Sequence, residues 1–407
     1  MRGLYNARLV AASRVAPIAP MSPSTRTACF ARLTAANFCF FLTFTSFFLL
    51  PLHVRALGGT ERTIGLVMGT SGLAGLVSVL AVGALLDRFG RRIFLLGGIA
   101  TMSAASGAFL LVGRIGPAIF VLRAVQGLAF AAGFNAASTL AAEFAPEGRR
   151  AAALGLFGVS TLATHALAPT LGEQLVRLGG FPALFVAATV FSAVGLAVAW
   201  PLPDDAPARA RAAVPLRATA ELSTAIATVA CCGVAFGAVI TYVPTFVQDA
   251  ALGPIATFFL SYTAAAVLTR VAAGGLSDSL GRRTVVLPAL GLLAASIALL
   301  AAVRSALALA TAGLLFGTAQ GFVYPTLNAF TLDLAEPGQL GRTQTLYNGA
   351  FNLGTTAGSM ALGPVAQALG HRATFLVAAA MAATALVVFA VGARRVSPER
   401  AMSVPSA

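Results

Sequence analysis

Long apolar runs alternate along this chain with short clusters of polar, charged and turn-forming residues. Twelve such runs, each of 19 to 27 residues, lie between residues 33 and 392. About 20 helical residues cross the roughly 30 Å of hydrocarbon in a bilayer. Because lipid offers no partner to an unpaired backbone group, and the runs lack the polar alternation of barrel strands, each run is predicted to be a helix. The predicted spans are 33–57, 63–86, 93–113, 117–142, 150–176, 182–200, 222–248, 254–277, 284–303, 306–332, 343–369 and 373–392.

The composition agrees with a chain that lies in lipid. Hydrophobic residues make up 58% of its 407 residues and charged residues only 10%, whereas a soluble domain carries about 25% charged residues. We therefore predict an all-α membrane protein with twelve transmembrane helices, and we exclude an ordinary soluble domain. The cysteines show neither metal-ligand nor simple disulfide spacing and are expected to be reduced and mostly buried. They are Cys29, Cys39, Cys231 and Cys232.

The placement of the arginines predicts the orientation of the chain. All 27 basic residues are arginine, and the net charge is +14. A basic excess is also typical of nucleic-acid-binding proteins, but these arginines fall in ones, twos and threes between the apolar runs. Nineteen lie in the terminal regions and the loops on the same side, against six on the opposite side. Because positively charged loops are retained in the cytoplasm, we expect an inner (plasma) membrane protein with both termini cytoplasmic and no nucleic-acid partner.

The first 32 residues contain arginine and serine but no acid, a composition shared with organelle transit peptides. Two other interpretations are favoured: a disordered cytoplasmic tail, or an upstream start codon with Met21 as the true start. No signal peptide is expected, because the first apolar run is too long for the hydrophobic region of one.

The second half of the chain repeats the plan of the first. The segment 83–92 returns as 274–283, an offset of 191 residues. Four further landmarks, including the Gln-Gly pairs at 126–127 and 320–321, return at offsets of 190 to 195. Because six spans separate the copies, the halves are predicted to be parallel repeats that can rock about a central site. The predicted regions are a tail at 1–32, a six-helix half at 33–200, a Pro- and Arg-containing cytoplasmic linker at 201–221, a second half at 222–392 and a tail at 393–407.

The repeated loop carries a spaced pattern of glycine, aspartate and arginine. With the two halves and the linker, this loop resembles the major facilitator superfamily of secondary transporters, whose signature between spans 2 and 3 is G-x-x-x-D-[RK]-x-G-[RK]-[RK]. The first copy matches every position, and in the second copy Ser279 replaces the first basic residue. The matching residues are Gly83, Asp87, Arg88, Gly90, Arg91 and Arg92, followed by Gly274, Asp278, Gly281, Arg282 and Arg283.

The resemblance implies that this loop is a cytoplasmic latch that stabilises the outward-open state. Asp87 lies near the end of one predicted helix, where a carboxylate can accept charge-assisted bonds from arginines or from a neighbouring helix start. The alternative is that the arginines only retain the loop in the cytoplasm. The fixed spacing of aspartate and glycine favours the latch, and we expect Asp87→Asn to leave the protein inserted but to slow transport.

Arg123 lies inside the fourth predicted span. A guanidinium near mid-helix costs about 3 kcal/mol on insertion scales, so it should face protein or water and have a partner. With Gln126 and Gly127 it resembles the family's span 4 motif R-x-x-Q-G, which implies proton coupling or substrate contact. The alternative is an arginine that only bonds carbonyls of adjacent helices. Phe130 shares the face of Arg123 and adds an aromatic lining.

The fifth span combines a histidine with a proline motif. The run Ala168-Pro169-x-x-Gly172 partly resembles the antiporter motif of drug exporters, G-x-x-x-G-P-x-x-G-G, with Ala168 and Glu173 in place of glycines. His165 lies at mid-span, where it either titrates near physiological pH or serves as a neutral hydrogen-bonding partner.

The second half contributes one intramembrane charge and several polar stripes. Arg270 either reaches toward the membrane interface or belongs to a site. The uncharged polar residues either line a cavity or join helices; they are Tyr242, Tyr262, Gln320, Tyr324, Asn328, Asn348 and Asn352. Small-residue rows are interpreted as close-packing faces, namely Gly65 with Gly69 and Gly354 with Gly358.

Acidic residues are missing from the middle of spans 1, 4, 7 and 10, since Glu143, Glu173, Asp249 and Asp333 all lie near predicted ends. An embedded carboxylate commonly couples protons to cationic drugs, so its absence favours a neutral or anionic substrate attracted to Arg123. The sequence has no Walker A pattern and no metal, nucleophile or nicotinamide constellation. Neither an enzyme nor a cofactor is expected.

We therefore predict a monomeric, proton-linked exporter that moves a small organic molecule by alternating access, as an antiporter of the drug or sugar efflux type; its partners are the substrate, the proton and the lipid bilayer. One alternative is a sugar or organic-acid importer of the same fold. Another is a non-transporting membrane receptor or scaffold, because fold alone does not establish function.

Overall fold

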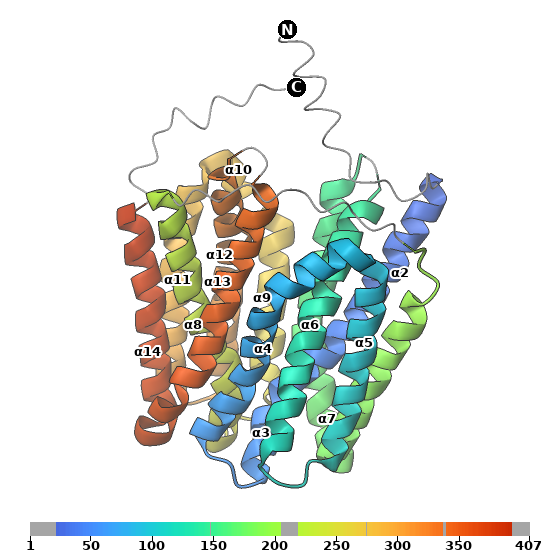
Figure 1. Ribbon diagram of the computed structural model, residues 1–407. Coiled ribbons are helices and arrows are strands. Elements are labelled where there is room, and N and C mark those ends of the chain that lie inside the picture. Colours follow the sequence, from blue (N-terminus) through green and yellow to red (C-terminus); the bar gives the residue numbers. More distant parts are fainter. Residues whose placement is uncertain (1–21, 147, 205–218, 274, 337–338, 393–407) are drawn as a thin grey trace.

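The computed structural model describes residues 22–146, 148–204, 219–273, 275–336 and 339–392, and the regular structure in these ranges is entirely helical (Figure 1). The helices of the first half are α2 (Pro23–Ser46), η1 (Phe47–Leu49), α3 (Leu50–Ala56), α4 (Glu61–Phe89), α5 (Arg91–Ala108), η2 (Phe109–Leu111), α6 (Pro117–Phe144) and α7 (Arg150–Ala199). Those of the second half are α8 (Ala220–Asp249), α9 (Ala256–Ala273), α10 (Leu276–Leu280), α11 (Arg282–Ala302), α12 (Ala306–Asp333), α13 (Leu340–Ala361) and α14 (Gly363–Gly392).

These helices supply twelve membrane spans in two halves, as predicted. Within the described ranges, eight helices are long and apolar enough to cross a membrane by length and composition, and α9 is a shorter apolar helix. The long helix α7 provides two spans, because its backbone leaves the helical conformation at Gly179 and Gly180. Gly180 has a φ of 68°, in the left-handed region that glycine tolerates best. Gly370, with a φ of 79°, breaks α14 in the same way.

Several boundaries differ from the sequence-based expectation. The first helix begins at Pro23, ten residues before the predicted start at 33, because the Ser22 hydroxyl caps it and accepts a bond from the backbone N–H of Thr25 at 3.2 Å. The predicted span 343–369 is divided between α13 and the start of α14. Most of the predicted linker, at 205–218, lies outside the described residues, as do residues 1–21 and the tail 393–407.

Hydroxyl caps fix the starts of three more spans. The side chains of Thr60, Thr219 and Ser305 accept bonds from backbone N–H groups three residues later, at 3.1 to 3.3 Å. Each cap satisfies one of the four N–H groups that a helix start leaves unpaired. These starts lie outside the hydrocarbon, where polar capping residues are tolerated.

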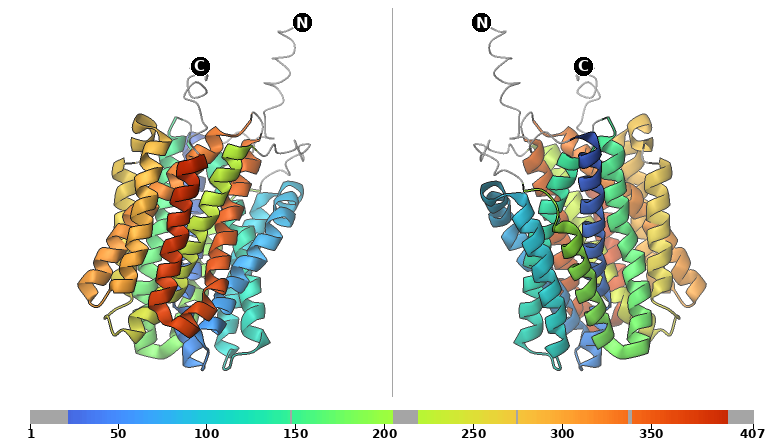
Figure 2. Two further views of the ribbon diagram at one scale, coloured as in Figure 1. Left: turned by 90° about the vertical axis from the view of Figure 1, so that its left-hand side faces the viewer. Right: turned by 90° about the vertical axis from the view of Figure 1, so that its right-hand side faces the viewer.

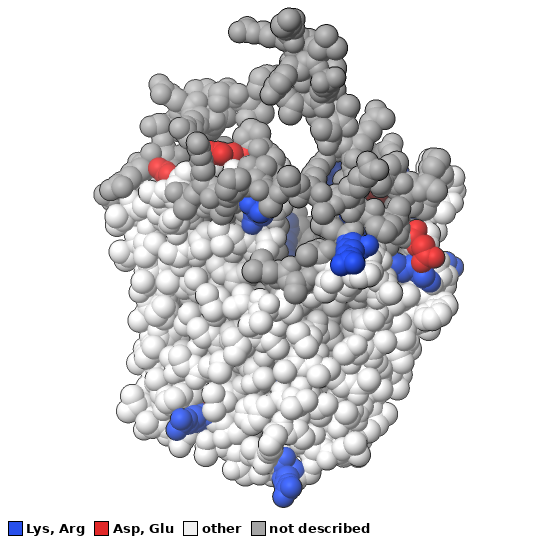
Figure 3. All heavy atoms as spheres, viewed as in Figure 1, with Lys and Arg blue, Asp and Glu red and all other residues white. Residues whose placement is uncertain are grey.

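The two halves lie side by side, with their helices running along one common axis (Figures 1 and 2). Following the predicted orientation, we call the end that carries the loop at Gly90 and α10 the inner end and the end that carries α3 the outer end; these are the top and bottom of Figure 1. On the face seen in Figure 3, charged side chains gather toward the two ends and leave an uncharged band between them. That distribution is the one expected of a protein surrounded by lipid.

Glycine rows bring helices together within and between the halves. A Cβ on Gly354 or Gly358 would collide with backbone carbonyls of α8, in the same half. A Cβ on Gly65 or Gly69 would collide with Ser359 or Met360 of α13, across the two halves. The prediction that these rows are close-packing faces is confirmed. Between the halves, α4 packs against α13 and α14, and α7 packs against α9.

Candidate functional site

The two copies of the loop motif adopt the same backbone conformation. Gly90 joins α4 to α5 with φ 88° and ψ 155°, and Gly281 joins α10 to α11 with φ 87° and ψ 142°. A side chain would be strained at this φ, which explains why the spacing places glycine at both positions.

The arginines that follow these glycines make matching contacts in each half. Arg91 forms an ion pair with Glu143 at the end of α6. Arg282 forms an ion pair with Asp333 at the end of α12, with Nε and Oδ2 3.3 Å apart. The following arginine in each copy donates to a backbone carbonyl near the end of the last helix of its half. Arg92 donates to the Trp200 carbonyl, after α7, at 2.7 Å, and Arg283 donates to the Ala390 carbonyl, in α14, at 3.4 Å. Each of these inner-end contacts therefore lies within one half. The motif was recognised from sequence, but its acidic partners Glu143 and Asp333 were not.

The remaining motif residues add little to this picture. Arg88 is exposed and its guanidinium lies 5.1 Å from the ring centre of Phe89. Gly274 lies outside the described residues. The structure also does not describe the side chains of Asp87 and Asp278 or the packing around Gly83. The predicted latch that depends on Asp87 therefore stays a prediction.

Arg123 is buried inside the first half, with 3% of its surface exposed. Its Nη1 donates to Gln126 Oε1 at 2.8 Å, its Nε donates to the carbonyl of Val67 at 3.4 Å, and its guanidinium lies 5.8 Å from the centre of the Phe47 ring. Gln126 in turn donates to Ser106 Oγ at 3.3 Å. This network joins α4, α5 and α6. All of these contacts of Arg123 lie within its own half. The bond to the Val67 carbonyl is the kind expected from the alternative interpretation, in which the arginine bonds carbonyls of adjacent helices.

Phe130 belongs to an aromatic cluster between α2 and α6. Its ring stacks on Phe44 with centres 4.3 Å apart and lies 5.5 Å from Phe41 and from Phe134. Because Phe130 and Phe134 are only partly buried, the cluster presents aromatic surface on one helical face of α6.

His165 connects the two halves at the middle of the first span of α7. Its Nδ1 lies 3.2 Å from the hydroxyl of Tyr262 in α9, and its ring packs edge-on against Phe48. The proline motif that follows leaves α7 helical: Ala168 and Pro169 are buried, and Gly172 is where α7 meets Leu49. The His165 contact with Tyr262 is the hydrogen-bonding role considered for it.

The polar stripes of the second half meet around Tyr324. The Tyr324 hydroxyl donates to Asn348 Oδ1 at 3.2 Å, Gln344 donates to the same oxygen at 3.1 Å, and the Tyr347 hydroxyl donates to the Tyr324 carbonyl at 2.7 Å. On the same face of α12, Gln320 Nε2 and Asn328 Oδ1 are buried without a partner in the described part of the chain. Of the remaining candidates, Asn352 is exposed and Tyr242 is fully buried, where its hydroxyl donates to the Ser359 carbonyl.

A cluster of charged residues joins the halves at the outer end. We call Arg55, Glu61, Thr245, Asp249 and His371 the outer cluster. Arg55 of the first half forms one ion pair with Glu61 of the same half and another with Asp249 of the second half. His371, also of the second half, lies 3.4 Å from a Glu61 oxygen and 3.5 Å from an Asp249 oxygen. Thr245 lies 3.0 Å from the His371 ring nitrogen.

Electrostatics favour the charged form of Glu61 in this arrangement. Burial by itself would raise the pKa of Glu61, but hydrogen bonds and charges from His371 and Arg55 outweigh it and hold the pKa below its ordinary value. Sequence reasoning missed this cluster, because its members stand at predicted span ends and share no motif.

Glu173 makes a second contact between the halves at the outer end. Its two carboxylate oxygens accept bonds from the backbone N–H groups of Ile255 and Ala256, at 3.3 and 3.1 Å. These groups begin α9, so a carboxylate of one half caps a helix of the other and is favoured by the helix dipole. The glutamate that departs from the antiporter motif therefore has a defined structural partner.

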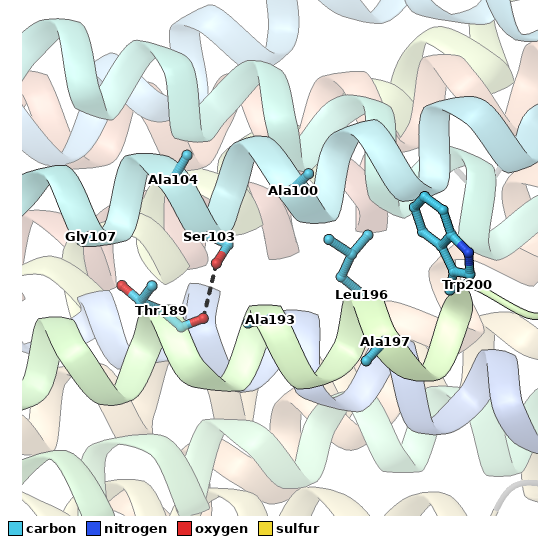
Figure 4. Close-up of a pocket in the computed structure, with 9 residues that line it drawn as sticks. All are labelled: Ala100, Ser103, Ala104, Gly107, Thr189, Ala193, Leu196, Ala197 and Trp200. Atoms are coloured by element: carbon cyan, nitrogen blue, oxygen red, sulfur yellow. Dashed lines mark hydrogen bonds between the residues drawn. The ribbon is translucent and has the colours of Figure 1, made fainter.

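An apolar groove of about 480 Å³ lies away from these residues, between α5 and α7 (Figure 4). Ser103 Oγ donates to the Thr189 carbonyl across it at 3.0 Å, and Trp200 stands at one end. The groove contains none of the site residues predicted from sequence. In the described ranges, the four cysteines are free and no group of three or more His, Cys, Asp or Glu could hold a metal ion.

Comparison with curated proteins identifies two relatives that match part of the chain. The inner membrane transport protein YajR of Escherichia coli (strain K12) is 32% identical over 151 residues, which cover 36% of this chain and 32% of that protein. The methylenomycin A resistance protein of Bacillus subtilis (strain 168) is 31% identical over 140 residues, which cover 32% of this chain and 28% of that protein. The matched segments thus span about a third of each relative's length.

Solved structures resemble the fold over most of the chain. The human organic anion transporter MFSD10 (TETRAN) is 16% identical with a TM-score of 0.70, and the match covers 89% of this chain and 99% of that one. The nucleoside transporter NupG, solved as a point mutant, is 14% identical with a TM-score of 0.75, and the match again covers 89% of this chain and 99% of that one. At these identities the likeness concerns the fold.

A family model described as Major Facilitator Superfamily matches residues 33–261 and 255–406, which together cover nearly the whole chain. The repeated loop, the two six-helix halves and this match agree, and the chain belongs to the Major Facilitator Superfamily of membrane transporters.

Proposed function

We propose that this transporter exports a small organic solute across the bacterial inner membrane by alternating access, as a monomer, in exchange for protons. The observation that carries the proposal is the distribution of polar contacts between the halves. The outer cluster and Glu173 bridge the halves at the outer end, and the two ion pairs described at the inner loops, Arg91–Glu143 and Arg282–Asp333, each lie within one half. Contacts arranged in this way close one side of the molecule and leave each half intact as a rigid unit.

The rocking motion that we propose breaks the outer contacts and preserves those within each half. Arg123 and its partners keep α4, α5 and α6 together. The glycine row of α4 provides a smooth face on which α13 can slide, because Gly65 and Gly69 present no side chain there. His165 and Tyr262 face each other across the halves at the middle of the first span of α7, which is where a solute would separate them.

The direction of transport is supported by one relative and by the placement of charge. That relative is named as a resistance protein, a function that export would serve, and the matched segment covers 28% of it. Both relatives are bacterial, and the other is named as an inner membrane protein. Retention of the arginine-rich loops would place the inner end in the cytoplasm, so the closed outer end faces away from it.

Dye uptake into membrane vesicles tests the proposal. Everted vesicles that contain the protein are energised with NADH and given either carboxyfluorescein or ethidium. Accumulation of a dye that a protonophore abolishes supports proton-linked export. Accumulation in right-side-out vesicles instead would overturn export in favour of import. If neither dye, nor a wider panel of organic solutes, moves in either vesicle type, transport itself is contradicted.

A cross-linking variant tests whether the outer end must open. Arg55→Cys with Asp249→Cys, in a background without the native cysteines, is treated with a short bis-maleimide. We expect the linked double variant to stop transporting, and each single variant to continue under the same treatment. Undiminished transport by the linked protein would contradict a mechanism in which the halves separate at this end.

A further inference from the structure

Arg270 is a partly buried arginine of α9, and unlike the buried Arg91 and Arg123 it has no bonding partner among the described residues. Its Nε is shut off from solvent without a hydrogen bond, and no ion pair or hydrogen bond to another described residue reaches its guanidinium. By contrast, Arg123 bonds to Gln126 and Val67, and Arg91 pairs with Glu143. A guanidinium within the membrane bundle is expected to be paired, so the lack of a partner at Arg270 needs an explanation.

The packing of α9 against α12 shows which residues of α12 lie level with Arg270. Gly317 lies against the backbone of Tyr262, and Gly321 lies against Ala266 and Thr269. The two helices run in parallel, and continuing this register brings Arg270 level with Tyr324. Arg270 therefore lies at the level of the polar face of α12 that carries Gln320, Tyr324 and Asn328.

The groups near Arg270 are uncharged and polar. Its charge acts on His165, Tyr262, Tyr324 and Tyr347. Two further polar atoms on the neighbouring face of α12 are buried and unpartnered, Nε2 of Gln320 and Oδ1 of Asn328. These residues supply several hydrogen-bond donors, but among the described residues none of them supplies a compensating negative charge.

We propose that Arg270 is the binding residue for a carboxylate, or a similar small anionic group, of an organic substrate. A planar carboxylate accepts two parallel bonds from a guanidinium and supplies the missing charge. The partly exposed ring of Tyr324 in α12 would receive the apolar part of an aromatic ligand. This inference deepens the proposed transport function and rests on it, because it names the substrate class of the same central region.

Equilibrium binding to purified protein tests this assignment without requiring transport. The matched probes are 2-naphthoate and 2-naphthamide, which share a ring system and differ in charge. Binding is measured from the rise in Tm with probe concentration, at constant ionic strength in detergent. We expect the wild type to bind 2-naphthoate at least about tenfold more tightly than 2-naphthamide, as a charge-assisted bond of ordinary strength provides.

Substitutions then identify the residue responsible. Arg270→Gln should reduce 2-naphthoate binding to the level of the amide, and Arg270→Lys should restore part of it, because lysine keeps the charge but not the planar fork. Arg304→Gln, which changes an exposed outer-end arginine, should bind as the wild type does. Equal binding of the two probes by the wild type, or undiminished 2-naphthoate binding by Arg270→Gln, would overturn the assignment.

Stability without ligand separates a binding role from a structural one. If Arg270 is a charge without a partner inside the bundle, Arg270→Gln should leave the Tm of the free protein unchanged or raise it. A large fall in that Tm would show that Arg270 supports the fold, against the proposal. Carboxylate binding with no solute movement in vesicles would instead contradict the transport function and leave this assignment standing.

Discussion

Arg55 of α3 forms an ion pair with Asp249 of α8, which ties the outer end of the first half to that of the second. The same guanidinium also contacts Glu61 of its own half. Arg55 thus neutralises two carboxylates that would otherwise repel each other across the interface of the halves. Opening of the outer end must break one of these pairs, so the strength of this contact helps to set the population of the closed state.

Substitution of the outer cluster should favour the outer-open state. Asp249 is half exposed, with 50% of its side chain accessible, whereas Glu61 is 10% accessible. Because solvent screens the exposed pair, we expect Asp249→Asn to shift the equilibrium about twofold and Glu61→Gln about fivefold or more, the latter corresponding to about 1 kcal/mol. The measurement is energy transfer between dyes on cysteines that replace Arg114 and Arg304, exposed outer-end positions of the two halves.

The control for this experiment is Arg177→Gln. Arg177 is an outer-end arginine that pairs with Glu173 within one helix, at 3.4 Å, and is 56% accessible, so its loss should leave the energy transfer unchanged. An equal loss of transfer in Arg177→Gln and Glu61→Gln would show that outer-end charge in general, and not the cluster, sets the equilibrium.

Acid should weaken the closed outer end through Glu61. The pKa of Glu61 in the cluster lies below its ordinary value of 4.5, so the ionised form favours the closed state. Its contribution is complete above the ordinary pKa and is lost as the pH falls through the lowered pKa. We expect the Glu61-dependent part of the energy transfer to fall as the pH drops below about 4.5. Glu61→Gln should remove this acid transition, and an unaltered transition in that variant would assign it to another group.

Glu173 should contribute independently of the outer cluster. Glu173→Gln removes the charge that caps α9 of the opposite half, and a cap of this kind is worth about 1 kcal/mol. We expect a shift toward the outer-open state of about fivefold in the same energy-transfer assay. The double variant with Glu61→Gln should show the product of the two shifts, because the substitutions share no partner. A double variant no more open than either single variant would show that the two contacts act as one unit.

The residues that repeat along the chain explain why the fold was predictable. Gly90 and Gly281 stand 191 residues apart and have the same φ to within a degree, and the apolar runs mark the spans because lipid permits only helices there. The offset also contained information that was not used. Glu143 and Asp333 are 190 residues apart, and they turned out to be the partners of the paired arginines Arg91 and Arg282.

The candidate site was less predictable, because it depends on how helices are rotated against one another. The sequence left two interpretations of Arg270 open, and only the packing of Gly317 and Gly321 against α9 shows that it lies level with Tyr324. Asp249 lies near the end of a predicted span, and His371 belongs to no motif. No local sequence pattern predicts that these two residues, near spans 7 and 12, meet Glu61 near the start of span 2. Contacts between the halves join residues that are far apart in the sequence, so they leave no periodic signal in the chain.

Gly65 should control closure of the outer end by its lack of a side chain. A methyl group there would collide with the Ser359 carbonyl and the Tyr242 hydroxyl, both of the opposite half. Backbone atoms cannot move aside as a flexible side chain can, so Gly65→Ala should push α4 away from α13 and favour the outer-open state. We expect a loss of energy transfer between the labelled outer ends and slower transport at equal membrane abundance. Gly97→Ala is the matched control, because a Cβ at Gly97 meets nothing within 4 Å and alanine only raises the helix propensity there. If both alanine variants behaved as the wild type does, the close approach of α4 and α13 would not be what closes the outer end.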